Sequence, residues 1–417
     1  MIERLCAYFS VDPEIKRAAE RSLERVQALQ YAAQAENRIR ILEAFVDEKI
    51  GDSDLHESLG YGYDDPARTR YESLLARVFG ASAALARLSL VSGTHAIVAA
   101  IRALIPPSKT LLSVTGPPYD TLRNAILRAP KCLVESGMRY EEIALSGNGF
   151  DLEAIAQQLE DPDIAAVFVQ RSRGYAPRPS IGIDKSAALF SEIHNVRPDV
   201  AIIVDNCYGE LVETREPTNI GADVAVGSLI KNIGGGLAPA GAYAIGTSQA
   251  IEKIAAHHYA PGLRSGVGPT LHSGRALLQG LFLAPLVVEQ TLRGLDFAAA
   301  LFEELGYAVD PRCGASRTDT VQAIGLGDER GVRSFAEGLQ RAMPVNAAFR
   351  PEPGPVPGYE EPVIMSSGAF ISGATVELSC DAPLREPYEV YLQGGLFAEH
   401  TVAGALSAAQ AVKGRKL

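Results

Sequence analysis

The chain has 417 residues, of which 47% are hydrophobic and 21% are charged. This composition is that of a globular protein with a substantial core, and the length exceeds that of a usual single domain. A balance of 39 basic against 50 acidic residues gives a formal net charge of −11. That charge argues against nucleic acid and against an anionic membrane surface as partners.

The opening stretch MIERLCAYFSVDPEIKRAAE carries charges and lacks the apolar core of a signal peptide, and no run is long enough for a membrane span. We therefore expect a cytoplasmic protein. The five cysteines are odd in number, widely spaced and without a C-x-x-C pair. They favour reduced, mostly buried thiols over a disulfide framework or a zinc site, and we expect no metal.

Residues 1–59 are predicted to form an N-terminal helical arm. Asp12 can cap a helix whose first position is Pro13, and apolar residues then recur at the helical period. The arm is expected to end before GDSDLHESLGYGYDDP, which is rich in glycine and aspartate and therefore typical of a loop.

Residues 60–285 are predicted to form a large α/β domain with a mostly parallel sheet. Short apolar runs alternate there with amphipathic helical ones. The pairs and runs that show this are ALARLSLVSG with THAIVAAIRALI, TLLSVTG with YDTLRNAIL, then IAAVFVQ, VAIIVDN and DVAVGSLI.

Residues 286–417 are predicted to form a smaller α+β domain. A long helix through VVEQTLRGLDFAAALFEELG is followed by strands such as TVQAIGL and GATVELSC. No internal repeat or low-complexity tract interrupts this order.

Ser92, Gly93 and Thr94 form a turn between a predicted strand and a predicted helix. The first amides and the positive dipole end of that helix can bind a phosphate group. Serine and threonine also cap many helices that bind nothing, so the turn alone leaves both interpretations open. The chain has neither the G-K-[ST] of a nucleotide P-loop nor the G-x-G-x-x-G of a dinucleotide site.

Two further strand ends carry ionisable groups. AIIVDNCYGE delivers Asp205 to the end of a buried strand, where a carboxylate needs a donor or a cation unless it only forms a turn. Lys231 follows the next apolar run, in VGSLIKN, and partial burial is expected to lower its pKa and make it nucleophilic. A phosphate cradle, an aspartate and a strand-end lysine together describe a pyridoxal phosphate site.

The sequence also resembles the methionine gamma-lyase family, in the branch labelled aluminium resistance protein or cystathionine beta-lyase-like protein. The resemblance extends over about residues 60–400. The stretches that carry it are GYGYDD, SGTHAI, GPPYDTL, QRSRGY, VDNCYGE, GSLIKN with GGGLAP, QGLFLAP, PGYEEPVIM and LREPYEVYLQGGL.

This resemblance implies the fold-type I architecture of pyridoxal phosphate enzymes and a homo-oligomer, dimer or tetramer, with each active site at a subunit interface. Lys231 would form the Schiff base with the cofactor and carry protons. Asp205 would hold the pyridine nitrogen protonated. The phosphate would be bound by Ser92, Gly93, Thr94 and Ser228.

Three tyrosines receive roles by the same resemblance. Tyr119, in GPPYD, would stack on the cofactor ring and give a proton to the leaving group; a core aromatic is the alternative. Tyr61 and Tyr63, in GYGYDD, resemble the segment that reaches the partner subunit's phosphate, with structural packing as the alternative.

The substrate α-carboxylate needs a planar donor, so Arg173 and Arg385 are the candidates for binding it. The family's arginine precedes a late strand, and here Glu377 occupies that region. His95 is expected to pack or hydrogen-bond near the cofactor. Arg264 lies in a loop that resembles one lining the family's substrate entrance, with a solvated surface position as the alternative.

The predicted function is therefore a carbon–sulfur lyase that eliminates at the β or γ carbon of a sulfur amino acid such as methionine or cystathionine. The alternative is γ-replacement through a vinylglycine-type intermediate. An aminotransferase and a protein that captures the cofactor for a binding or regulatory role also stay open.

Overall fold

The computed structural model describes residues 1–56, 59, 63, 65–147 and 149–414. Residues 35–285 form one compact unit, here called the large unit, and residues 1–34 with 286–417 form a second, the small unit. Within the described residues, no helix has the length and apolar character needed to cross a bilayer. That residues 1–59, 60–285 and 286–417 behave as separate domains stays a prediction.

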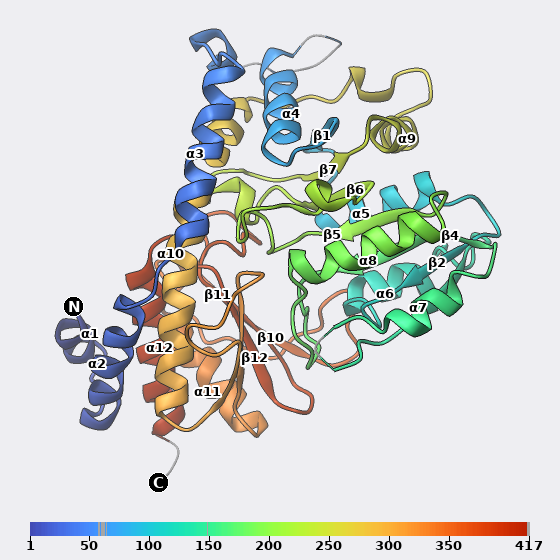
Figure 1. The fold of residues 1–417 in the computed structure, drawn as a ribbon. Coiled ribbons are helices and arrows are strands. Elements are labelled where there is room, and N and C mark those ends of the chain that lie inside the picture. Colours follow the sequence, from blue (N-terminus) through green and yellow to red (C-terminus); the bar gives the residue numbers. More distant parts are fainter. Residues whose placement is uncertain (57–58, 60–62, 64, 148, 415–417) are drawn as a thin grey trace. The chain divides into compact units, whose positions relative to one another are not determined.

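The large unit is built on a seven-stranded sheet with the strand order β1-β7-β6-β5-β4-β2-β3 (Figure 1). Strands β2 to β6 pair in parallel, whereas β7 runs antiparallel to both β6 and β1. The mostly parallel sheet predicted from the alternating pattern is thus confirmed. Its strands are β1 Ala83–Arg87, β2 Thr110–Ser113, β3 Arg139–Glu142, β4 Ile164–Gln170, β5 Ala201–Asp205, β6 Val224–Ser228 and β7 Ala242–Gly246.

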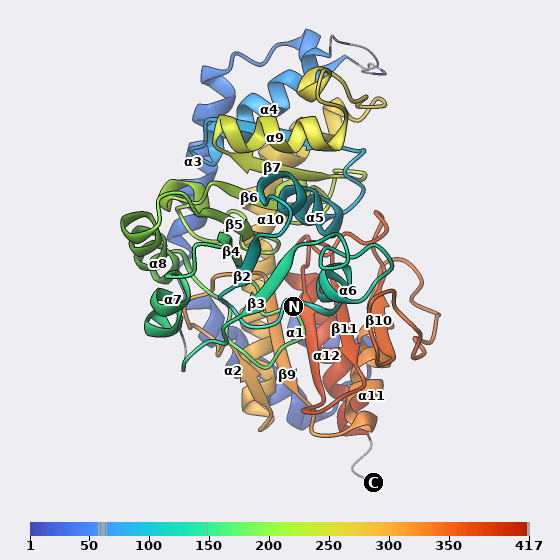
Figure 2. The same ribbon diagram turned by 90° about the vertical axis from the view of Figure 1, so that its right-hand side faces the viewer.

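Helices cover both faces of this sheet (Figure 2). Because side chains alternate along a strand, Phe168 of β4 enters the core beneath α5, α6 and α9, and its neighbour Val167 enters the core beneath α7 and α8. The helices are α3 Ala32–Asp47, α4 Pro66–Val78, α5 Gly93–Leu104, α6 Asp120–Leu127, α7 Leu152–Gln158, α8 Ile183–Val196 and α9 Ser248–His258. Short 3-10 turns are η1 Asp52–Leu55, η2 Pro217–Ile220, η3 Asn232–Gly234 and η4 Arg264–Gly266.

Helix α10, Gly274–Glu304, begins in the large unit and ends in the small one. The small unit otherwise combines helices with an antiparallel sheet of order β10-β11-β12-β9-β8, and Phe297, Phe302 and Phe335 lie in its core. Asp12 accepts a hydrogen bond from the Glu14 amide at 2.8 Å and caps α2, as predicted. The elements are α1 Ile2–Tyr8, α2 Pro13–Gln27, β8 Ala308–Asp310, β9 Val321–Gly325, α11 Glu329–Gln340, β10 Val363–Ser367, β11 Ser379–Pro383, β12 Glu389–Gln393 and α12 Ala398–Lys413.

One predicted strand differs from the structure. GATVELSC was expected to be extended, but β11 begins only at Ser379. The carboxylate of Glu377 accepts hydrogen bonds from the amides of Phe370 and Ile371, at 2.9 and 3.0 Å, and so holds the preceding residues in a loop. A local side-chain bond to the backbone has replaced strand pairing there.

Candidate active site

The carboxyl ends of three neighbouring parallel strands bring polar side chains to one edge of the large sheet. Gln170 ends β4, Asp205 ends β5 and Ser228 ends β6. The register pairs Gln170 with Asp205, and Asp205 with Val226, two residues before Ser228. In sheets of this kind, ligands bind beyond the carboxyl ends of the strands.

The Ser92–Thr94 turn lies against this same edge, because Gly93 has no side chain. A Cβ atom added there would lie 3.2 Å from Sγ of Cys207 and 3.6 Å from Cβ of Ser228. The amino end of α5 therefore meets the ends of β5 and β6. Oγ of Ser92 accepts a hydrogen bond from the His95 amide at 3.1 Å, so this hydroxyl also caps the helix.

Lys231 follows β6 at the start of a 3-10 turn and is half-buried. Its Nζ atom lies 3.5 Å from the centroid of the Tyr208 ring. Burial alone would lower the pKa of Lys231, but Cys207, Tyr208 and Asp205 outweigh burial and raise it. The lowered pKa expected from the sequence is therefore wrong for the chain by itself.

Asp205 is buried, with 4% of its surface exposed. Its Oδ1 accepts a hydrogen bond from the Cys207 amide at 3.1 Å. Burial raises the pKa of Asp205, and the facing charge of Lys231 opposes that rise. A buried carboxylate in such a position is stabilised by a cationic or N–H donor.

Tyr119 precedes α6 and connects the Ser92–Thr94 turn to β4. Its hydroxyl lies 2.7 Å from Oγ1 of Thr94, and its amide donates to Oε1 of Gln170 at 2.9 Å. Three of the residues predicted from separate motifs, Thr94, Tyr119 and Asp205, are thus brought to one end of the sheet.

The predicted carboxylate-binding arginines lie in different units. Arg173, in the large unit, is 4% exposed, and its Nε donates to the carbonyl of Ala176 at 3.3 Å. Arg385 is in the small unit, and its NH1 lies 3.3 Å from Oε2 of Glu361.

Of the two tyrosines expected to reach a partner, Tyr61 lies outside the described residues. Tyr63 is 79% exposed. Their predicted roles, like those of the arginines, stay predictions.

His95, which is expected near the cofactor, contacts a second histidine, His258. The rings of His95 and His258 lie 5.4 Å apart, and Nε2 of His258 lies 2.9 Å from Oγ of Ser89. Burial, with His95 nearby, lowers the pKa of His258 to about 4, so this ring is neutral at physiological pH. Arg264 forms an ion pair with Glu252.

Sequence reasoning missed a buried network that follows Asp205. Glu210 is completely buried, and its Oε1 accepts a hydrogen bond from the Tyr243 hydroxyl at 2.8 Å. Burial raises the pKa of Glu210 to about 8. The stretch VDNCYGE supplied the only signal, since polar residues directly after a buried strand must find partners.

The glycines that follow Lys231 allow a close approach to the unit's own helix α10. A Cβ atom at Gly234 would lie 2.1 Å from the Leu229 carbonyl oxygen, and one at Gly280 would lie 2.3 Å from the Gly234 carbonyl oxygen. Gly235 has φ of 53° and faces Gly280 in the same way. These glycines thus fix the lysine loop against α10.

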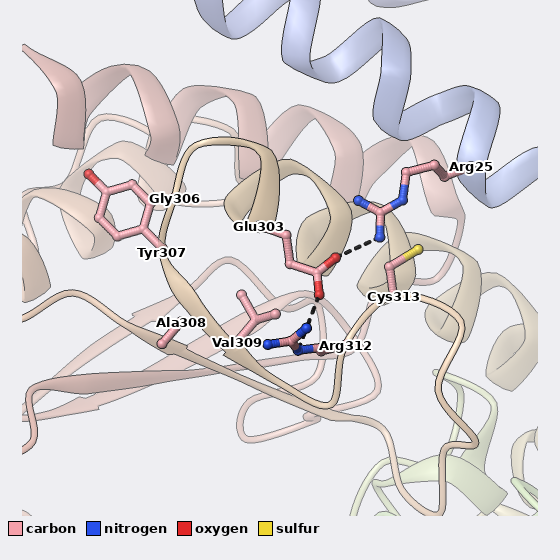
Figure 3. A pocket seen from close by; sticks show the side chains of 8 residues that line it. All are labelled: Arg25, Glu303, Gly306, Tyr307, Ala308, Val309, Arg312 and Cys313. Carbon is pink, nitrogen blue, oxygen red and sulfur yellow. Dashed lines mark hydrogen bonds and ion pairs between the residues drawn. The ribbon is translucent and has the colours of Figure 1, made fainter.

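A pocket of about 530 Å³ in the small unit offers a contrast (Figure 3). Its lining includes Glu303, which pairs with Arg25 at 2.6 Å and with Arg312 at 3.9 Å. Both arginines of this pocket pair with its single lining carboxylate, and its lining contains none of the residues at the strand ends of the large sheet, so it is distinct from the candidate active site.

The fold defines the class of protein. A methionine gamma-lyase from Micromonospora echinospora, CalE6, has a TM-score of 0.59 at 18% identity, over 84% of this chain and 87% of that one. The likeness shows the fold-type I architecture of pyridoxal phosphate-dependent lyases.

The chain belongs to the methionine gamma-lyase family, whose model matches residues 13–413. The YnbB protein of Bacillus subtilis is 40% identical over 386 residues, which are 91% of each chain. A Clostridium novyi protein described as a carbon-sulfur lyase involved in aluminium resistance has 37% identity and a TM-score of 0.92, over 98% of each chain. The predicted resemblance is confirmed, and the family identifies the protein as a pyridoxal phosphate-dependent lyase.

The residues present fit the cofactor that this family implies. A buried carboxylate, an amine beside it and a helix amino terminus lie at one sheet edge, and Gly93 keeps that edge free of a side chain. These groups match a pyridinium nitrogen, an aldehyde and a phosphate in chemical type.

Proposed function

We propose that the protein is a carbon–sulfur lyase that acts on a sulfur amino acid and converts it, with water, into a thiol, ammonia and a 2-oxo acid. The observation that supports this most is the position of Asp205 and Lys231 beyond neighbouring parallel strands, beside the amino end of α5. Pyridoxal phosphate, when bound, supplies the electron sink that makes the Cα proton acidic.

Lys231 would hold the cofactor through its Nζ atom and then, once displaced by the substrate amino group, take up the Cα proton. Asp205 would accept the N–H of the pyridine ring. That contact would give the buried carboxylate the charged partner that its surroundings call for.

The first amides of α5, at Gly93 and Thr94, would bind the phosphate, with the hydroxyls of Ser92 and Ser228 beside them. The hydroxyl of Tyr119, held by Thr94, would donate a proton to the leaving sulfur. The substrate carboxylate would be bound by Arg173 or Arg385, and Tyr61 or Tyr63 would reach the phosphate of a second copy of the chain.

The first experiment is to measure 2-oxo acid release from methionine, cystathionine and cysteine, with mass identification of each product. Release of 2-oxobutyrate from methionine would show γ-elimination, and pyruvate from cysteine or cystathionine would show β-elimination. Absence of any 2-oxo acid, with the cofactor still covalently held, would contradict the proposed lyase activity.

Substitution of Lys231 by alanine tests the site itself. After borohydride reduction, the wild-type chain should carry the cofactor mass on Lys231, whereas Lys231→Ala should carry none and should not turn over. The exposed Lys253 provides the matched control, since Lys253→Ala should retain both. Turnover by Lys231→Ala would refute the assignment.

A further inference from the structure

The aromatic ring that faces Lys231 belongs to a residue with no role in the function proposed above. Nζ of Lys231 lies 3.5 Å from the centroid of the Tyr208 ring. An ammonium group at this distance above a ring face is attracted by the electrons of the ring, and the attraction is larger where water is scarce. Tyr208 is half-buried, so the site is partly dry.

Tyr208 reaches this position through an uncommon backbone conformation. Its φ angle is 71°, in the left-handed region that non-glycine residues seldom adopt. Such a conformation persists only where the surrounding structure holds it, and it is found most often at functional sites. A turn with no further role would not require this conformation of Tyr208.

The residue next to Lys231 holds the Tyr208 loop. Nδ2 of Asn232 donates to the carbonyl of Tyr208 at 2.9 Å and to the carbonyl of Glu210 at 3.0 Å. The lysine and the ring that it faces are therefore joined through one asparagine side chain. These bonds fix the backbone of the Tyr208 loop relative to the residue that follows Lys231.

The other side of the loop is held by Arg171, which lies completely inside the large unit. Its NH1 donates to Oδ1 of Asn206 at 2.5 Å and contacts the carbonyl of Gly209 at 3.4 Å. A Cβ atom at Gly209 would lie 2.5 Å from this NH1. The backbone on both sides of Tyr208 is thus held by buried side chains.

Once the released lysine has taken up the Cα proton, its ammonium group needs a partner in this buried site. Asp205 is the anion beside Lys231, but it is the group that would be engaged by the pyridine ring. Glu210 also faces this region, and burial raises its pKa to about 8, so it stays mostly uncharged at neutral pH. Among these groups, the Tyr208 ring can attract the ammonium without binding the cofactor's nitrogen.

We infer that Tyr208 is a positioning residue that holds Nζ of Lys231 while the lysine is not joined to the cofactor, and that it holds this atom most strongly once the lysine has taken up the Cα proton. This inference rests on the proposed role of Lys231. The ring keeps the freed amine in one place, so that it returns to the same substrate carbon instead of swinging into solvent.

Two substitutions separate the ring from the rest of the residue. Tyr208→Phe keeps the ring and removes the hydroxyl. Tyr208→Asn removes the ring, and asparagine tolerates the left-handed backbone better than other residues, so the loop can keep its conformation. Thermal unfolding of both variants shows whether the fold is retained.

The first readout uses the full chain without cofactor, with ¹³C-labelled lysine. The ring current of Tyr208 should shift the ε-CH₂ protons of Lys231 upfield in the wild type and in Tyr208→Phe. Tyr208→Asn should return them to the position of the exposed Lys253. An unshifted Lys231 signal in the wild type would overturn the inference, whatever the enzyme's activity.

The second readout uses the enzyme with cofactor and glycine, which can displace the lysine but has no leaving group. Loss of the ring should disfavour the free lysine, so the apparent Kd for glycine, followed by visible absorbance, should rise about tenfold in Tyr208→Asn. Tyr208→Phe should stay close to the wild type. Equal effects of both substitutions would show that the hydroxyl, and not the ring, matters, and would contradict the inference. Absence of bound cofactor in the wild type would instead contradict the proposed function.

Discussion

The hydroxyl of Tyr119 lies 2.7 Å from Oγ1 of Thr94, so the residue that precedes α6 is joined to the first turn of α5. Thr94, which is also proposed to bind the phosphate, thereby orients the phenol of Tyr119. The same tyrosine is fixed through its amide by Gln170, at 2.9 Å. Tyr119 is thus held at its backbone amide and at its hydroxyl.

We therefore predict that Tyr119→Phe retains the covalently bound cofactor but loses activity. The loss of a positioned proton donor should lower kcat/KM by about 10²- to 10⁴-fold. Thiol release, measured with a disulfide reagent, and the visible absorbance of the bound cofactor would show the two effects separately.

Tyr140→Phe is the matched control, because the Tyr140 hydroxyl donates to Glu142 on β3, at 2.8 Å, and has no predicted role. It should leave kcat/KM unchanged. A fully active Tyr119→Phe enzyme would show that the leaving group takes its proton from another source.

Asp205→Asn should keep the shape of the strand end and remove its charge. Without the carboxylate, the pyridine nitrogen is no longer held protonated, and exchange of the substrate α-proton with deuterated solvent should slow by at least about tenfold. Proton NMR of the amino acid would follow this exchange. Asp223→Asn, whose carboxylate accepts from the Ile202 amide at 2.7 Å, serves as a structural comparison. Equal exchange in Asp205→Asn and the wild type would exclude the proposed role.

Because the pKa of the buried Glu210 is raised, we predict that the free energy of unfolding depends on pH. The folded chain keeps this carboxyl protonated up to about pH 8, whereas the unfolded chain ionises it near about pH 4.3. The folded chain therefore binds more protons in this interval, and the free energy of unfolding is highest below it. As the pH rises towards 8, the stability contributed by Glu210 is lost, at up to about 1.4 kcal/mol per pH unit.

Glu210→Gln should flatten this part of the stability profile, as measured by urea unfolding at several pH values. Glu192→Gln, at an exposed position on α8, should leave the profile as in the wild type. A slope that persists in Glu210→Gln would assign the dependence to another group.

A buried ion pair in the small unit gives a prediction of stability alone. Nε of Arg317 lies 2.9 Å from Oδ1 of Asp296, and each side chain is 4% exposed. Arg317→Ala would leave a buried carboxylate without its cation and should lower the free energy of unfolding by about 3–5 kcal/mol. Arg333→Ala, which removes an exposed pair with Glu329, should cost less than about 1 kcal/mol. Similar losses for the two variants in denaturant unfolding would contradict this ranking.

The fold and the order of its elements could be predicted because the pattern of apolar runs was clear. The strand that ends at Asp205 and the helix that begins after Ser92 lie where the pattern placed them. The error at GATVELSC arose because Glu377 bonds to a neighbouring loop, an interaction that no periodicity reveals.

The neighbours of Lys231 were harder to predict. The sequence indicated a lysine at a strand end, but Tyr208 meets it through a left-handed backbone held by Arg171 and Asn232, which are distant in the chain. The prediction that the pKa of Lys231 is lowered was wrong for the same reason. Burial lowers the pKa of Lys231, and groups that only the fold brings near reverse that effect.

The contact between Gly234 and Gly280 has an evolutionary consequence. Neither position has room for a methyl group, since each Cβ would lie within 2.3 Å of a carbonyl oxygen. Both positions should therefore stay glycine among related chains, because a side chain at Gly280 would displace the loop that carries Lys231, and a side chain at Gly234 would clash with Leu229 within that loop. A relative that lacks these two glycines would have to hold its lysine loop against α10 by other contacts. The two glycines would therefore mark the family members that share this loop position.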